Sequence, residues 1–210
     1  MPAHAAATMN PRKTPVQARS TASVEAILEA TIQVLLAVGK EKLTTTKVAA
    51  RAGVSVGTLY QYFPNKSALL LAALTRHLDE VTKEVERVCR EQKGEPLLAM
   101  GTALIHAFLT VKMKDVKTSV ALYAVSSDVD AARIVKMKGV RSTKAIVGML
   151  TSSCETLVRD PELVASMLQG AMVGVSRRLL DSDAPEKRFE GMREELVFFV
   201  CAYLESCLVW

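Results

Sequence analysis

The chain has 210 residues and a formal net charge of +5, and half of its residues are hydrophobic. This length and composition allow a sizeable core, which excludes intrinsic disorder for most of the chain. No stretch reaches the roughly 18 uninterrupted apolar residues of a membrane span, and residues 1–10 lack the basic start of a secretory signal. We therefore expect a cytoplasmic protein.

The positive charge is concentrated near the N-terminus. Residues 1–66 contain eight Lys or Arg and three Asp or Glu, whereas residues 67–210 contain nineteen of each. Because clustered Lys and Arg attract phosphate groups, this distribution favours a nucleic-acid-binding segment at the start of the chain. An accidental bias in a short segment is the alternative.

Residues 1–18 contain three prolines and no hydrophobic periodicity, which predicts a flexible arm. Arg12, Lys13 and Arg19 make the arm region basic. Such an arm can lie against DNA, and a solvated tail is the alternative.

Residues 24–38 place apolar side chains at helical spacing and are followed by Gly39, which predicts a first helix with a glycine C-cap. Lys40 and Lys42 then lie in the connection to the next element.

Residues 44–67 form the most informative stretch. Thr44 can cap a short helix, Gly53 can end it in the left-handed conformation, and Ser55 can cap the next helix. In that second helix, at about residues 56–62, Leu59 and Phe63 would face inward. This order of elements predicts a helix-turn-helix.

The same stretch resembles the DNA-binding signature of the TetR family of bacterial repressors. The resemblance rests on Thr44, Ala49-Ala50, Ala52-Gly53-Val54-Ser55, Gly57-Thr58-Leu59-Tyr60, Tyr62-Phe63 and Asn65-Lys66. It implies an all-α protein with a three-helix DNA-binding domain at residues 19–66. Residues 67–210 are then a helical bundle for regulation, ligand binding and dimerisation.

The resemblance also implies roles for individual residues. Phosphate contacts are expected from Thr44, Tyr60, Tyr62 and Lys66, and contacts to base edges from Val56, Gly57, Thr58 and Gln61. Thr45 and Ser55 complete the expected DNA-binding set. Thr45 and Lys40 differ from the residues usual in the family at these positions.

The expected reading helix contains no Arg or Lys, so it lacks the bidentate fork that reads guanine. Gln61 can still pair with adenine, and Val56 or Thr58 can contact a thymine methyl group.

Asn65 can cap a long helix over residues 65–92, which would join the two domains and carry Lys66 in its first turn. Pro96 begins another helix, which extends to about residue 113 and contains His106. A lone His at such a position is commonly a hydrogen-bonded core residue, and a ligand contact is the alternative.

Residues 119–125 and 128–154 predict two further helices, and this half of the chain is rich in methionine. Flexible methionines can line a pocket for varied apolar ligands, and ordinary filling of a helical core is the alternative. The candidate ligand-contacting residues are Met100, His106, Phe108, Tyr123, Met137 and Met172.

Residues 162–180 and 186–207 predict two strongly apolar helices, and such a pair exposes more apolar surface than a small bundle can hide. The resemblance implies that these helices form a four-helix dimer interface, whereas internal packing is the alternative. The candidate interface residues are Met167, Gly170, Gly174, Val197, Phe198 and Tyr203.

The four cysteines are scattered without a CxxC pair, so we expect buried thiols, with a redox-sensing Cys201–Cys207 pair as the alternative. The three histidines show no metal-ligand spacing. We therefore expect no metal site, no cofactor and no enzymatic activity.

Together, the pattern and the resemblance imply a repressor that binds a palindromic operator as a homodimer. A small apolar or amphipathic effector would release it from DNA. The main alternative is a DNA-binding regulator or activator without a small-molecule ligand. A helical enzyme and a purely structural dimerisation module are further alternatives, for which the sequence offers little.

Overall fold

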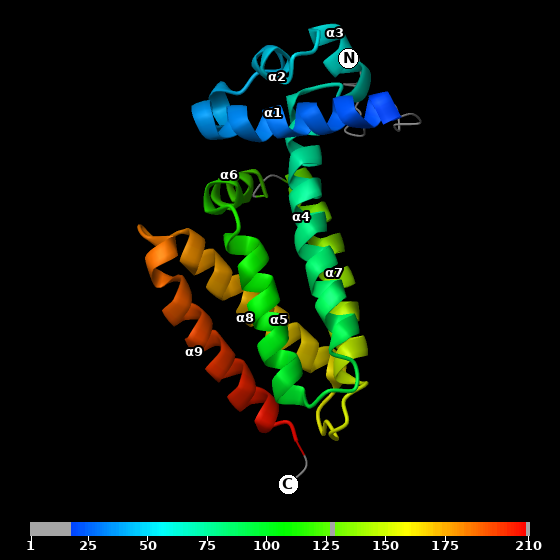
Figure 1. Cartoon of the computed structure of the whole chain (residues 1–210), viewed down its shortest axis with the longest axis vertical. Coiled ribbons are helices and arrows are strands. Elements are labelled where there is room, and N and C mark those ends of the chain that lie inside the picture. The colour runs from blue at the N-terminus through cyan, green and yellow to red at the C-terminus, as the bar shows by residue number, and fades with distance from the viewer. Residues whose placement is uncertain (1–17, 127–128, 209–210) are drawn as a thin grey trace, which may run out of the picture. The chain divides into compact units, whose positions relative to one another are not determined.

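A computed structural model describes residues 18–126 and 129–208 of the chain (Figure 1). These residues form nine helices, and the predicted all-α class is confirmed. The predicted arm lies almost entirely outside the described residues. In chain order the helices are α1 (Ala18–Lys42), α2 (Thr45–Ala52), α3 (Val56–Tyr62), α4 (Lys66–Glu91), α5 (Leu97–Met113), α6 (Val116–Ser126), α7 (Val129–Leu150), α8 (Pro161–Leu180) and α9 (Pro185–Glu205).

Internal contacts divide the chain into two compact units. The first unit extends to Arg76 and also includes Ala121–Ala132, whereas the second unit consists of His77–Val120 and Arg133–Trp210. The long helix α4 therefore contributes its first residues to one unit and the remainder to the other. The sequence had suggested a boundary at residue 66.

The first unit is built around α1, with α2 and α3 beside it in blue to cyan in Figure 1. Its core includes Ile27, Leu35, Val48, Leu59 and Phe63, all of them buried. The inward orientation predicted for Leu59 and Phe63 is therefore confirmed.

Residues 20–42 of α1 are long and apolar enough, by length and composition, to cross a membrane, and the bent pair α5–α6 passes the same test. Core helices also pass this test. In α1 the side chains of Ile27, Leu28 and Leu35 are buried against the other residues of the protein.

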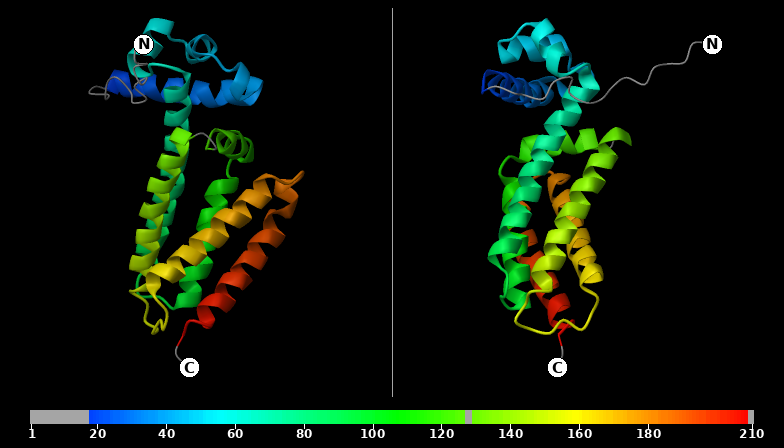
Figure 2. Two further views of the ribbon diagram at one scale, coloured as in Figure 1. Left: turned by 180° about the vertical axis from the view of Figure 1, so that it is seen from behind. Right: turned by 90° about the vertical axis from the view of Figure 1, so that its right-hand side faces the viewer.

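In the second unit α5 packs against both α8 and α9, and Figure 2 shows the three helices from two further directions. The contact between α5 and α9 is close at Gly101. A Cβ atom there would lie 2.6 Å from Leu204 Cδ1 and 3.1 Å from Val200 Cγ1. Only a residue without a side chain allows the two helices to approach in this way.

Charged side chains connect α7 to the second-unit part of α4. Lys138 pairs with Asp79, and Arg141 Nη2 donates to Glu86 Oε2 at 2.7 Å. The Glu86 carboxylate raises the pKa of Arg141 above its ordinary value, by hydrogen bonding first and by charge second. These contacts are polar bridges between the two helices, and Val81, Val85 and Val88 of α4 lie in the core.

The loop between α7 and α8 connects three parts of the second unit. Glu155 Oε2 accepts a hydrogen bond from the Leu97 backbone N–H at 2.7 Å, and Ser152 Oγ accepts one from Gly94 N–H at 3.3 Å. The Val158 N–H donates to the Cys207 carbonyl at 2.9 Å. A distant carboxylate thus caps α5, whose preceding residue Pro96 provides no side-chain cap.

All four cysteines are free thiols, so the Cys201–Cys207 pair is not a disulfide in this structure. Cys89 and Cys207 are buried and Cys201 is half-buried. Cys154 is exposed because it lies in the α7–α8 loop, so the expectation of a buried thiol is wrong for that residue.

Candidate functional site

The supporting helix α2 begins and ends as its sequence predicts. The Thr44 hydroxyl accepts a hydrogen bond from Lys47 N–H at 3.3 Å, so Thr44 caps the helix. Gly53 ends it with φ 68°, in the left-handed region. Val48 and Ala49 are buried, which leaves the opposite face of α2 exposed.

Helix α3 also follows the prediction. Ser55 Oγ accepts from Thr58 N–H at 2.9 Å and lies 2.8 Å from the Thr58 hydroxyl. Asn65 Oδ1 accepts from Ala68 N–H at 2.8 Å and so caps α4. The two caps hold α3 between fixed ends, which gives its exposed residues a defined orientation.

The exposed surface of α3 is uncharged. Ser55, Val56, Gly57, Tyr60 and Gln61 are exposed, whereas Thr58 and Tyr62 are half-buried. Gly57 adds no side chain to this surface. A Cβ atom there would have only Ser55 Oγ nearby, at 3.7 Å. Seven of the predicted DNA-binding residues therefore lie on or beside this one short helix.

Two lysines bind the last two backbone carbonyls of α1. Lys66 Nζ donates to the Glu41 carbonyl at 3.1 Å, and Lys47 Nζ donates to the Lys42 carbonyl at 2.9 Å. The two carbonyls belong to consecutive residues, so both amines are bound at the C-terminal end of α1. Lys47 was missed as a site residue by sequence reasoning, and its position in the first turn of α2 was the available signal.

The acidic residues of α1 are largely neutralised by Arg76. Its guanidinium pairs with Glu25 at 3.0 Å and with Glu29 at 3.3 Å. Arg51 Nε donates to Gln33 Oε1 at 2.6 Å. With two carboxylates paired, the positive charge near Lys47 and Lys66 is less opposed within the first unit.

Tyr60 and Thr45 are joined directly. Their hydroxyl oxygens lie 3.0 Å apart, and either can donate. This contact links α3 to the first turn of α2. The structure therefore brings together two residues that the sequence had placed separately in the DNA-binding set.

The candidate ligand residues fall into separate environments. Met100, Phe108 and Met172 belong to one buried hydrophobic cluster of the second unit. Met137 is exposed, and Tyr123 belongs to the first unit. His106 is exposed, so the expectation of a core histidine is wrong: the buried positions of α5 on either side of it are Leu104, Ile105 and Phe108.

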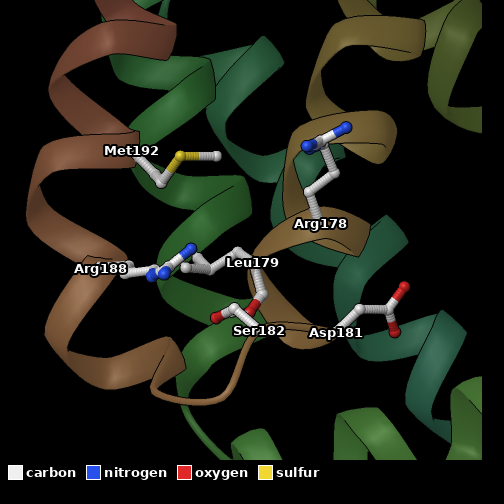
Figure 3. Close-up of a pocket in the computed structure, with 6 residues that line it drawn as sticks. All are labelled: Arg178, Leu179, Asp181, Ser182, Arg188 and Met192. Carbon is white, nitrogen blue, oxygen red and sulfur yellow. Dashed lines mark hydrogen bonds between the residues drawn. The ribbon is translucent and has the colours of Figure 1, made fainter.

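Two hollows on the second unit lie at its surface. One, of about 400 Å³, lies where α8 ends and α9 begins, and Figure 3 shows its arginines, Arg178 and Arg188, around Leu179. The other is a groove of about 690 Å³ between α7 and α8. There Thr143 donates to Gln169 Oε1, while Gln169 Nε2 donates to the Gly139 carbonyl at 3.0 Å.

Apolar side chains remain exposed on α8 and α9. Phe198 is 72% exposed, Phe199 57% and Met167 53%. Gly170 and Gly174 follow Met167 at helical spacing, and a Cβ atom at either would have no neighbour within 4 Å. Val197 and Tyr203 differ from the other candidate interface residues because they are half-buried against the core.

Among residues 18–126 and 129–208, no group of three or more His, Cys, Asp or Glu residues is arranged to hold a metal ion.

The fold and the capped α2–α3 pair define a helix-turn-helix DNA-binding protein with a separate helical unit. Residues 27–73 match the model for bacterial regulatory proteins of the tetR family, and residues 96–204 match that for the tetracyclin repressor-like C-terminal domain. The chain belongs to the TetR family of transcriptional regulators, which are DNA-binding transcription factors and not enzymes.

The sequence relatives match part of the chain. The transcriptional repressor KstR of Mycolicibacterium smegmatis is 43% identical over 61 residues, which are 29% of this chain and 30% of KstR. The nucleoid occlusion factor SlmA of Haemophilus ducreyi is 24% identical over 141 residues, 56% of this chain and 69% of SlmA. The chain thus matches less than a third of the length of KstR.

Solved structures of the same fold cover most of the chain. A Mesorhizobium loti protein assigned to the TetR family has a TM-score of 0.77 at 18% identity and covers 92% of this chain and 100% of its own. SmeT, the repressor of the Stenotrophomonas maltophilia efflux pump SmeDEF, has a TM-score of 0.68 at 20% identity and covers 88% of this chain and 91% of its own. At these identities the likeness establishes the fold.

Proposed function

We propose that this protein is a transcriptional repressor that binds a palindromic operator as a homodimer and is released by a small-molecule effector. The observation that carries the proposal is the uncharged exposed surface of α3, together with two lysines, Lys47 and Lys66, whose amines bind consecutive carbonyls at the end of α1. Repression is supported by the 43% identity over 61 residues to KstR, a protein named as a transcriptional repressor.

The proposed contacts divide into two groups. Lys66, Thr44, Tyr60 and Tyr62 bind phosphates. Lys47 joins them because its amine, like that of Lys66, is bound at the C-terminal end of α1. Thr45 orients the Tyr60 hydroxyl through their hydrogen bond. Affinity then comes mainly from these border residues and falls as salt rises.

The exposed part of α3 supplies the base contacts. Gln61 is exposed and can present its amide to the N6 and N7 atoms of adenine, while Val56, which is 37% exposed, can contact a thymine methyl group. Gly57 has no side chain, so the backbone of α3 can approach the major groove of DNA there. Thr58 is the next residue of the helix. An A·T-rich half-site centre follows from this chemistry.

Dimerisation is proposed through the exposed apolar face of α8 and α9. Met167, Phe198 and Phe199 would lose solvent contact there, and Gly170 and Gly174 would allow a second backbone to come close. A two-fold dimer can place two reading helices about 34 Å apart on one face of DNA. Val197 and Tyr203, which are half-buried against the core, would then lie beneath the interface residues.

Effector release requires that the ligand bind one state of the dimer more tightly than the other. The second unit is its proposed site, with Met100, Phe108 and Met172 as candidate contacts, and His106, Met137 and Tyr123 as outlying ones. The second candidate function, a regulator or activator without a ligand, is kept because three of these residues are tightly buried in the core. We propose a cytoplasmic location for either.

Selection of DNA from a random library by the purified protein, followed by fluorescence anisotropy, tests the proposal. We expect a palindromic site bound by two chains. Gln61→Ala should relax the base preference at one position of each half-site, while Lys93→Ala, an exposed lysine of the second unit, should bind normally. No enrichment of any site, or binding by a single chain, would overturn it.

A further inference from the structure

Lys112 lies on the buried face of α5. The buried residues of this helix recur at helical spacing, and Lys112 comes four residues after Phe108 and three after Leu109. Its side chain is half-buried, unlike those of Lys114 and Lys117, which are exposed. An ammonium group therefore extends a stripe that is otherwise apolar.

The described residues give this ammonium group no hydrogen bond and no ion pair. Three carboxylates of the second unit have other partners. Asp115 accepts from Thr118 N–H at 2.9 Å and from the Thr118 hydroxyl at 2.6 Å. Asp79 pairs with Lys138, and Glu86 pairs with Arg141.

The Lys112 side chain starts from a fixed backbone. Its carbonyl accepts a hydrogen bond from the buried Ser119 hydroxyl at 2.8 Å, which ties the end of α5 to α6. Burial lowers the pKa of the Lys112 amine, and no nearby charge opposes that effect. A partly desolvated cation without a partner is costly, and an anion from outside the chain would relieve the cost.

We propose that Lys112 binds the anionic head of the effector, which is therefore an amphipathic carboxylate with an apolar tail. The tail would lie beside Lys112 at the end of α5, where Val111 and Met113 are half-buried. This inference rests on the proposed effector-controlled repressor and specifies the chemistry of its ligand. A neutral apolar ligand would leave the ammonium group without a counter-charge.

Decanoate and decanol are suitable probes because they share a ten-carbon chain and differ in charge. Isothermal titration of the full chain should show decanoate binding about tenfold more tightly than decanol. Lys112→Met should remove this preference and Lys112→Arg should retain it. Lys114→Met is the matched control, an exposed lysine two residues away, and should behave as the unaltered protein.

Equal binding of the two probes, no binding of decanoate at millimolar concentration, or a preference that survives Lys112→Met would overturn the proposal. Thermal melting of the unliganded variants is a second measure. Lys112→Met should melt at the same or a higher temperature, because an unpaired charge on a half-buried side chain is removed. A lower melting temperature for both Lys112→Met and Lys112→Gln, with Lys114→Met unchanged, would mean that the amine is already paired.

DNA binding measured in parallel separates this inference from the function on which it rests. If decanoate binds in a Lys112-dependent way but does not release the selected DNA, the proposed anion site stands and the proposed effector release is contradicted. Release by both probes equally would keep the repressor and reject the anion site. A chain that selects no DNA would reject the repressor alone.

Discussion

The side-chain amine of Lys66 donates a hydrogen bond to the carbonyl oxygen of Glu41, and the two atoms lie 3.1 Å apart. The bond joins the first turn of α4 to the C-terminal end of α1. A lysine amine has three donors, so two remain for a phosphate group. The contact holds the cation in place before DNA arrives, which reduces the entropy lost on binding.

Replacement of Lys66 by alanine should weaken DNA binding across all sequences. Because a phosphate contact releases counterions, the plot of log affinity against log salt should become shallower by about one unit. Anisotropy titrations at several salt concentrations measure this slope. Lys93→Ala provides the matched loss of one exposed lysine, and an unchanged slope in Lys66→Ala would remove Lys66 from the phosphate contacts.

The hydrogen bond between Thr45 and Tyr60 should couple their contributions to DNA binding. Tyr60→Phe and Thr45→Val each remove one hydroxyl, and the effects of the single changes should not add in the double variant, with a coupling of about 0.5–3 kcal/mol. Both residues are at least partly accessible, so the folded state should tolerate the changes. Strict additivity would show that the two hydroxyls act independently on DNA.

Gly101→Ala should destabilise the second unit. The added methyl group would meet Leu204 and Val200, and overpacking of this kind costs about 1–3 kcal/mol. Gly148→Ala is the control: it lies on an exposed helical face with no neighbour within 4 Å and should stabilise by roughly 0.5–1 kcal/mol. Urea unfolding measures both. Equal stability of the two variants would contradict the close α5–α9 contact.

Iodoacetamide should modify Cys154 well before Cys89. Cys154 is exposed, whereas burial raises the pKa of the Cys89 thiol to about 12. Since only the thiolate reacts, Cys89 labelling should be slow near neutral pH and should rise as the pH approaches that value. Peptide mapping by mass spectrometry after short exposures distinguishes the sites. Early labelling of Cys89 in the folded protein would contradict its burial.

Much of the reading domain could be predicted because its determinants act locally. Thr44, Ser55 and Asn65 each cap a helix by accepting a backbone N–H three residues later, and Gly53 adopts its left-handed conformation through its own missing side chain. Such interactions need no knowledge of distant residues. The family signature is built from these same positions.

Other features depended on contacts between residues far apart in the chain. His106 is exposed and the Lys112 side chain is half-buried because of the side of α5 that packs against α8 and α9. Helical spacing alone did not determine which side that is. The capping of Leu97 by Glu155 spans 58 positions of the chain.

The sequence by itself determined the helices, their caps and the family, because these depend on side chains acting on nearby backbone. Only the tertiary structure decided that Lys47 and Lys66 both bind the end of α1, that Gly101 lies against Leu204, and that Lys112 has no counter-charge among the described residues. Each of these depends on the packing of separate helices, where burial and distance set the energy of a charge or a methyl group.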